Sequence, residues 1–352
     1  MQIKPINAKN STICDGLRIV LAGSVGSTRQ TLAGLIRNQA NVVGALELGR
    51  DKSKQVSGYQ CLSDIAVTAE IPCESFRNIN DAETVNTIRT WNPDLLFVVG
   101  LSQLVKSELL SMPRLGCVGF HPTLLPNGRG RAPLAWLTFD SAIGAATFFL
   151  METRADSGPI LAQEPFRVSA NDYATDVIYS INRAIDVALD RWLPRLLTGE
   201  WDPQIQDDSK ATYYGRRAPE DGLIDWQRPA KEIYALIRAT SHPHPGAYTY
   251  VKDTKIVVWS AHLETELPYH GVVGRVLKIE DDQDCLVQTG DGLLWLTDMD
   301  CVNPSDDLDV NRPLRVGMKL GYVVEDEFCR LNQRITELEQ RVAQLDPAMP
   351  GV

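Results

Sequence analysis

The sequence lacks several features that would assign it to a disulfide-rich, metal-binding or membrane class. Its seven cysteines are odd in number and contain no C-x-x-C pair. A disulfide framework or a zinc site is therefore not expected, and the thiols are expected to be reduced. No apolar run approaches the ~20 residues of a membrane span, and the N-terminus lacks the basic and then apolar pattern of a signal peptide. We expect a soluble, cytoplasmic protein without a metal site.

Positive charge is also scarce. The chain has 35 lysines and arginines against 45 aspartates and glutamates, which gives a net charge of −10. Nucleic-acid binding relies on many contacts between basic side chains and phosphates. A broad surface for tRNA or DNA is therefore not expected, although a local basic patch is compatible with this balance.

The first part of the chain alternates between strand and helix patterns with short connections. The expected strands cover 17–22, 41–48, 94–99, 117–120, 146–151 and 160–168, and the expected helices 27–37, 63–69, 82–90, 103–110 and 173–197. Within the last helix, Pro194 is expected to introduce a kink or an early end. Such alternation predicts an α/β domain with a doubly wound, mostly parallel sheet, in which ligands bind beyond the carboxyl ends of the strands.

The second part has a different pattern, and 352 residues suffice for two domains. A helix is expected at 230–240, and short strands at 247–251, 255–260, 271–278, 285–289 and 292–297, with Gly and Asp turns between them. These runs are typical of a small antiparallel barrel. We therefore expect an extension at 1–16, a first domain at 17–200, a linker at 201–212, a second domain at 213–322 and a terminal helix at 323–346.

The terminal helix carries apolar residues at spacings of 4, 3, 4, 3, 4 and 3. They are Val324, Phe328, Leu331, Ile335, Leu338, Val342 and Leu345. This heptad pattern is typical of a coiled coil and predicts a homo-oligomer assembled through residues 324–345. The alternative is a single amphipathic helix packed on its own chain, which uses a wider apolar stripe.

One histidine and one acid are candidates for chemistry. His121, one of five histidines, follows the strand expected at 117–120 and begins a turn-rich loop, and Asp156 lies in a second turn. An imidazole can take a proton from an amine and return it to a leaving group. A carboxylate nearby orients the ring and raises its pKa. If the two turns meet, the pair can perform acid–base catalysis; the alternative is a structural histidine.

The residues around this pair resemble a known signature. From His121 the chain reads H-P-T-L-L-P-N-G-R-G-R-A-P, which is similar to the H-x-S-L-L-P-x-Y-R-G-x-x-P loop of the folate-dependent formyltransferases. From Asp156 it reads D-S-G-P-I, which resembles the D-x-G-x-I turn of that family, and G-L-S-Q-L from Gly100 resembles its folate-pocket segment. The segments Y-Y-G-R-R from Tyr213 and H-P-G-A from His244 resemble its C-terminal OB-like barrel domain. The resemblance covers roughly residues 17–300.

The resemblance implies the transfer of a formyl group from 10-formyltetrahydrofolate to an amine. It implies that His121 is the acid–base group and that Asp156 raises its pKa. It also implies a set of residues that bind the formyl-folate: Gln103, Leu104, Val105, Thr123, Leu124, Leu125, Pro126, Arg131, Glu152, Thr153, Arg154, Ala155 and Asp156.

One position departs from the family pattern. Two residues before the histidine the family carries an asparagine that stabilises the tetrahedral oxyanion, and here this position is Gly119. The loss of one oxyanion donor typically costs about 3 kcal/mol of barrier, roughly a hundredfold or more in rate. Three explanations stay open: a slow enzyme, a pocket with another purpose, or a substitute donor, for which Asn127, a backbone N–H near Gly119 and an ordered water are candidates.

The net charge favours a small amine over tRNA as the acceptor. By analogy with the family, we expect an amino sugar carried on a nucleotide, and methionyl-tRNA formyltransferase activity is less favoured. Two further functions stay open. The His121–Asp156 pair can activate water, which would make the protein a 10-formyltetrahydrofolate hydrolase. A non-catalytic relative that binds folate or a nucleotide and assembles through its terminal helix is the other alternative.

Overall fold

The structure is a computed structural model. It describes residues 16–51, 56–251, 254–280, 284–302, 314–322 and 324–345, so that the extension expected at 1–16 lies outside the described residues except for Gly16. The chain divides into two compact units. The first runs to Asp221 and includes Arg238–Pro245, and the second comprises Gly222–Ile237 and the chain from Gly246 onward.

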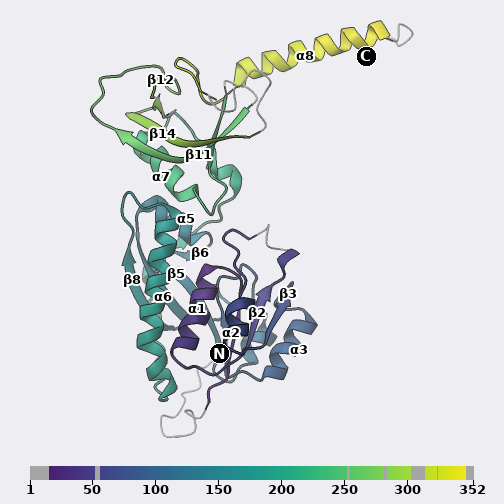
Figure 1. Cartoon of the computed structure of the whole chain (residues 1–352), viewed down its shortest axis with the longest axis vertical. Coiled ribbons are helices and arrows are strands. Elements are labelled where there is room, and N and C mark those ends of the chain that lie inside the picture. Colours follow the sequence, from purple (N-terminus) through teal and green to yellow (C-terminus); the bar gives the residue numbers. More distant parts are fainter. Residues whose placement is uncertain are drawn as a thin grey trace. The chain divides into compact units, whose positions relative to one another are not determined.

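The first unit contains a seven-stranded sheet with helices on both faces (Figure 1). Its strands are β1 (Ile19–Ala22), β2 (Val42–Leu48), β3 (Cys73–Phe76), β4 (Leu95–Val98), β5 (Gly116–Thr123), β7 (Ile143–Leu150) and β8 (Ile160–Arg167). Its helices are α1 (Gly26–Arg37), α2 (Ser63–Thr68), α3 (Ala82–Trp91), α4 (Ser107–Ser111), α5 (Pro133–Asp140) and α6 (Ala174–Leu197). In the order β3-β2-β1-β4-β5-β7-β8, the first five strands are parallel and β7 is antiparallel to both neighbours. The expected mostly parallel sheet is confirmed.

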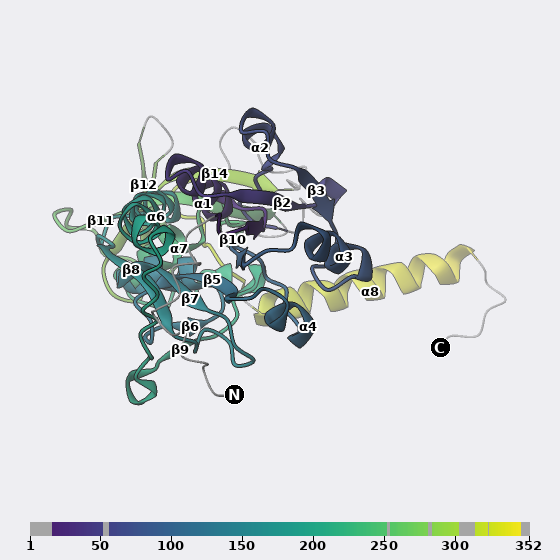
Figure 2. The ribbon, with the colours of Figure 1, turned by 90° about the horizontal axis from the view of Figure 1, so that it is seen from below.

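Successive residues of the central strands point to opposite faces of the sheet, because side chains alternate along a strand. Ile19 and Leu21 of β1 pack in the core that includes α1 and α6. Val20 and Ala22 pack in the core that includes α3 and α4. Figures 1 and 2 show α1 beside α6 and away from α3, and Figure 2 shows it away from α4 as well. The sheet is therefore buried on both sides, as expected of a doubly wound domain.

Several expected elements of the first unit differ in the structure. The helix expected at 103–110 is shortened to α4, because the Gln103 side chain bonds to the backbone of Arg77 and Ile79 and holds its segment out of helical geometry. The strand expected at 117–120 continues to Thr123, so His121 lies within β5 rather than on a loop after it. The helix α6 continues past Pro194 to Leu197, since Leu193 and Leu196 remain packed in the core.

The second unit is built on a five-stranded antiparallel sheet in the order β10-β11-β14-β13-β12. The strands are β10 (Ala247–Val251), β11 (Thr254–Glu264), β12 (Val276–Ile279), β13 (Cys285–Gln288) and β14 (Leu293–Val302), and the helix α7 (Ala230–Thr240) precedes them. The antiparallel arrangement is confirmed. Closure of this sheet into an OB-like barrel stays a prediction.

The terminal helix α8 (Val324–Leu345) forms as expected. Five of the seven heptad side chains lie among the described ones, whereas those of Val324 and Leu345 lie outside them. The five are 45% to 66% exposed, and their pairing in a coiled coil stays a prediction. Across the described segments, no helix combines the length and the apolarity that crossing a membrane requires.

Candidate active site

His121 lies where β5 extends beyond its parallel neighbour. The pairing of β4 with β5 ends at Val98 and Gly119, and His121 is paired only with Thr147 of β7. The register of β5 and β7 then shifts between His121 and Thr123, around Pro122, which has no N–H to donate. The histidine thus sits just past the carboxyl end of β4, at the edge where ligands bind in such sheets.

The hydrogen bonds of the ring indicate its tautomer. The His121 Nε2 lies 2.8 Å from the carbonyl oxygen of Gly128. Because a carbonyl only accepts, Nε2 carries a proton and donates it there. In the neutral ring Nδ1 is then unprotonated, and it lies 3.8 Å from the Asp156 Oδ2. The structure thus brings the two expected residues together, with Nδ1 as the nitrogen that can accept a proton.

The environment of His121 keeps the ring neutral. The residue is only 6% exposed. Burial lowers the pKa of His121 below its ordinary value of 6.5, and this effect outweighs the opposing effects of the Asp156 carboxylate and the Gly128 bond. Asp156 thus raises this pKa as expected, but the net direction is downward. A neutral imidazole suits a group that must first act as a base.

Asp156 is held by its own backbone conformation and by a hydrogen bond from a backbone N–H group to its carboxylate. Its own φ is +54°, a left-handed conformation that is uncommon for residues other than glycine. Its Oδ2 accepts a hydrogen bond of 2.9 Å from the Gly130 backbone N–H. The carboxylate is therefore held toward the loop that also contains the His121 partner Gly128.

The loop at 128–130 is held by a strand pairing that the sequence patterns did not indicate. Residues Arg129–Gly130 form a short strand, β6, which pairs in parallel with β9 (Tyr213–Tyr214). A Cβ at Gly128 would lie 2.7 Å from the Tyr214 ring, and one at Gly130 would lie 2.4 Å from the Tyr214 backbone oxygen. Both glycines also have positive φ, at +71° and +111°. The loop needs glycine because its own chain approaches there.

Two further residues support the pair without contacting the imidazole. Arg129 is 1% exposed, and its guanidinium donates to the Gln206 Oε1 and pairs with Asp208. Gln206 in turn donates to the carbonyls of Asp156, at 3.0 Å, and Gly158, at 2.7 Å. The Arg129 guanidinium thus binds partners within the protein, and Gln206 holds the turn at Asp156 in place through its carbonyl groups. Gln206 lies in the expected linker at 201–212, where no sequence pattern distinguishes it.

Gly119 packs against an aromatic ring. A Cβ at this position would lie 2.7 Å from Cζ of Phe149 and 3.0 Å from Cγ of Met151. Phe149 is 3% exposed. A side chain at position 119 therefore requires Phe149 to move. The space that the family's asparagine would take is occupied here by Phe149 and Met151.

The expected folate-binding residues at 103–105 form a segment tied to the chain after β3. The Gln103 amide donates to the Arg77 carbonyl and accepts from the Ile79 N–H, so both ends of this amide are engaged. Leu104 is 82% exposed, and Val105 packs partly on the core. Leu104 and Val105 thus leave apolar surface available to a ligand.

The other expected folate-binding residues differ in exposure. Thr123 is buried beside His121 and donates to the same Gly128 carbonyl at 3.3 Å, and Leu125 is buried at 2% exposure. Leu124 and Pro126 are half-buried, whereas Arg131 and the run 152–155 are exposed. The structure therefore places Thr123 and Asp156 next to His121 and turns Leu125 into the core.

A row of aromatic side chains begins at the site loop. Tyr214, which covers Gly128, stacks on Trp136 of α5 with ring centroids 5.8 Å apart and an interplanar angle of 15°. The Arg217 guanidinium lies 5.1 Å from the centroid of the Trp136 ring and 5.7 Å from that of Phe139. The row thus joins the loop that contacts His121 to a fixed cation.

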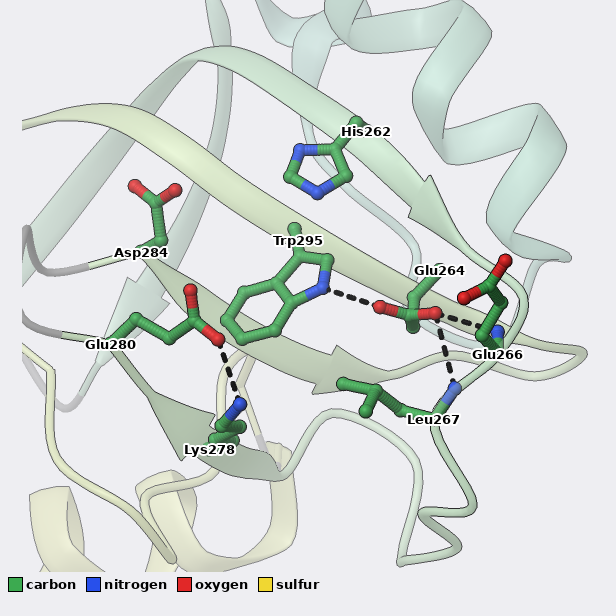
Figure 3. Close-up of a pocket in the computed structure, with 8 residues that line it drawn as sticks. All are labelled: His262, Glu264, Glu266, Leu267, Lys278, Glu280, Asp284 and Trp295. Carbon is green, nitrogen blue, oxygen red and sulfur yellow. Dashed lines mark hydrogen bonds and ion pairs between the residues drawn. The ribbon is translucent and has the colours of Figure 1, made fainter.

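A separate cavity of about 310 Å³ lies on the sheet of the second unit (Figure 3). Its lining residues are His262, Glu264, Glu266, Leu267, Lys278, Glu280, Asp284 and Trp295. Glu264 accepts from the Trp295 indole at 2.9 Å and from two backbone N–H groups, and Lys278 pairs with Glu280. The expected site residues do not include any of these eight side chains.

Known proteins resemble this chain in sequence and in fold. The formyl transferase family model matches residues 17–193, and the model of the formyl transferase C-terminal domain matches residues 217–303. A methionyl-tRNA formyltransferase of Syntrophomonas wolfei is 30% identical over 294 residues, which cover 79% of this chain and 89% of that protein.

Two solved structures share the fold at low sequence identity. HypX from Aquifex aeolicus in complex with tetrahydrofolic acid has a TM-score of 0.58 at 18% identity, over 80% of this chain and 43% of HypX. This chain thus spans less than half the length of HypX. The N-formyltransferase from Helicobacter canadensis, in complex with folinic acid and dTDP-3-aminofucose, has a TM-score of 0.58 at 15% identity, over 79% and 98% of the two chains. Given the two family models and the sequence relative, the chain belongs to the formyltransferase family and is a formyl-transferring enzyme.

Proposed function

We propose that the protein transfers a formyl group from 10-formyltetrahydrofolate to the amine of a nucleotide-linked amino sugar. His121 Nδ1 accepts the proton that the amine loses as its nitrogen bonds to the formyl carbon. Asp156 Oδ2, 3.8 Å away, stabilises the imidazolium that results. His121 then returns the proton to the folate nitrogen as the bond between that nitrogen and the formyl carbon breaks.

The donor side of the proposal is supported by surface that fits a folate. The exposed Leu104 and the half-buried Val105 offer apolar contacts, and the exposed residues 152–155 offer polar groups beside Asp156. In the Helicobacter canadensis and Aquifex aeolicus structures, folate compounds are bound by proteins of the same fold. A folate donor is thus compatible with the residues present.

The proposal of a nucleotide-linked acceptor is supported by the row of aromatic side chains that begins at Tyr214. A nucleotide offers a flat base and a charged diphosphate. Trp136 and Tyr214 provide an aromatic pair, and Arg217 provides a cation that lies against the rings of Trp136 and Phe139. Because Tyr214 also covers Gly128, a nucleotide on this row would place its sugar near His121.

The test measures folate release from 10-formyltetrahydrofolate with a panel of nucleotide amino sugars, with methionyl-tRNA and without an acceptor. We expect release only with a nucleotide amino sugar. Release without an acceptor would identify a hydrolase, and binding without release would identify a non-catalytic relative. A Trp136→Ala variant is expected to raise KM for the acceptor more than it lowers kcat, whereas Phe328→Ala, on α8, serves as the unaffected control.

Methionyl-tRNA is the second candidate acceptor, because the relative from Syntrophomonas wolfei is 30% identical over nearly its whole length. The net charge of −10 opposes it, since tRNA binding requires many phosphate contacts. Formylation of methionyl-tRNA with a steep salt dependence would favour this candidate and overturn the sugar acceptor.

A further inference from the structure

The helix α8 exposes an apolar stripe that needs a partner. Phe328, Leu331, Ile335, Leu338 and Val342 are 66%, 52%, 52%, 45% and 57% exposed. The residues between them are mostly charged or amide, with Cys329 and Thr336 among them, and all are exposed as well. Scattered single apolar residues are ordinary on a protein surface, but a continuous stripe along one helix marks an interface. We infer that α8 pairs with α8 of a second copy as a parallel, in-register, two-stranded coiled coil.

The residue types at the two seam positions indicate the number and direction of the strands. In heptad notation Phe328, Ile335 and Val342 occupy position a, and Leu331 and Leu338 occupy position d. Isoleucine and valine at a with leucine at d favour parallel dimers over trimers and tetramers. Two of the three a residues and both d residues follow this rule.

The spacing also favours a second helix over the surface of the same chain. The stripe advances strictly by three and four residues, which matches the 3.5-residue period of a coiled-coil seam. A helix packed on a globular domain presents a wider stripe with a period of 3.6 residues. In α8, the residues that would widen the stripe, such as Asn332 and Glu339, are polar and exposed.

The charges beside the seam select the parallel orientation. Arg334 lies at position g and Glu339 at position e, and in a parallel pair each g residue faces the e residue five positions further on in the partner. Arg334 would thus face Glu339 of the second copy, twice by symmetry. In an antiparallel pair g faces g, and the register that sets Leu331 against Val342 and Ile335 against Leu338 would set Arg334 against Arg341. Within one chain Arg334 pairs with Glu337 at 3.0 Å, a surface contact that can exchange.

The first experiment measures the mass of the full chain in solution by light scattering over a concentration series. We expect twice the chain mass of 39.0 kDa. Leu338→Asp, on the seam, is expected to give a monomer. Gln340→Asp places the same charge at the outer position f and is expected to leave the dimer intact. A monomeric wild-type chain, or a dimer that survives Leu338→Asp, would overturn the inference.

The second experiment determines the orientation. In a Cys329→Ser background, Leu331→Cys places one thiol on the seam at position d. Parallel, in-register helices bring the two introduced thiols face to face, within the distance that a disulfide requires, and mild oxidation should give a covalent dimer. In the antiparallel pair position 331 faces position 342, so a dimer without this crosslink would overturn the parallel arrangement.

A charge exchange tests the register. Arg334→Glu and Glu339→Arg should each weaken the dimer, roughly twofold to tenfold in dissociation constant, because each sets like charges together twice. The double variant restores opposite charges and should recover wild-type association. A double variant no tighter than the single ones would overturn the proposed pairing. Since none of these positions belongs to the site of His121, association and formyl transfer can be measured independently.

Discussion

The two units each place a histidine near carboxylates, but in opposite surroundings. In the first unit His121 is 6% exposed and faces one carboxylate, Asp156. In the second, His262 is exposed and lines a cavity together with four carboxylates (Figure 3). Burial lowers the pKa of His121, whereas hydrogen bonds from the Glu266 backbone N–H and the Trp295 indole lower the pKa of Glu264 to about 2.

This difference shows that the number of ionisable groups does not identify the reactive site. In the cavity of the second unit, the carboxylates are solvated, bonded to the backbone or paired with Lys278. At His121 the polar partners are few, and each has a geometric role: the Gly128 carbonyl sets the tautomer, and Asp156 faces the other nitrogen. Burial makes those contacts strong, because water does not compete with them.

The largest expected effect is on formyl transfer when the buried histidine is replaced. His121→Asn removes the proton acceptor and should lower kcat by roughly 10²- to 10⁴-fold, the usual contribution of a positioned acid–base group. The matched variant His262→Asn removes the exposed histidine and should leave kcat unchanged. The measurement is folate release with the best acceptor. Equal losses in the two variants would remove the distinction between the two sites.

The next effect concerns the charge of Asp156. Asp156→Asn keeps an oxygen for the Gly130 N–H but removes the charge that stabilises the imidazolium. The Gly128 bond still sets the tautomer, so we expect a loss of roughly tenfold to a hundredfold, a factor of about ten for each pKa unit lost. Because Asp156 raises the pKa of His121, its neutralisation lowers that pKa further. The acidic limb of the pH–rate profile should therefore move to lower pH; a move to higher pH would contradict this role.

The sequence predicted the two catalytic candidates because each lies in a short local motif. It also predicted most strands and helices, since their apolar periodicity is local. It did not indicate Gln206, Tyr214 or Trp136 as parts of the site, because these residues reach it through pairing between segments about 80 residues apart. The helix expected at 103–110 begins only at Ser107 for a related reason: the Gln103 side chain bonds to a segment 26 residues earlier, and this tertiary contact overrides the first part of the helical pattern.

A smaller effect is expected from the packing at Gly119. Gly119→Ala places a Cβ 2.7 Å from the Phe149 ring and should cost about 1–3 kcal/mol in the free energy of unfolding, because overpacking a core forces its neighbours to shift. Gly215→Ala is the control in the same unit, since a Cβ there meets nothing within 4 Å. Denaturant unfolding measures both. Equal stabilities would mean that Phe149 moves freely.

The same position tests the missing oxyanion donor. Gly119→Asn in a Phe149→Ala background has room for the amide, and we expect faster formyl transfer than Phe149→Ala alone. An unchanged rate would indicate that another group, such as Asn127 or a backbone N–H, already stabilises the oxyanion.

The smallest expected effect is the pH dependence of stability in the second unit. The pKa of Glu264 is lowered from 4.5 to about 2 by hydrogen bonds from Glu266, Trp295 and Leu267. A carboxylate with a lowered pKa in the folded state stabilises the fold above its ordinary pKa, and this contribution is lost as the pH falls toward 2. Glu264→Gln has no charge to lose, so its melting temperature should fall less than that of the wild type on acidification from pH 4.5 toward 2. The neighbouring Glu266→Gln should follow the wild type.

A salt series compares this effect with that at His121. Because the Glu264 carboxylate is exposed to solvent, the difference in melting temperature between wild type and Glu264→Gln should be small and should diminish in high salt. The acidic limb of the pH–rate profile that depends on the buried His121 should stay at the same pH. An equal effect of salt on the Glu264-dependent stability and on the His121-dependent rate would show that the two sites do not differ through burial.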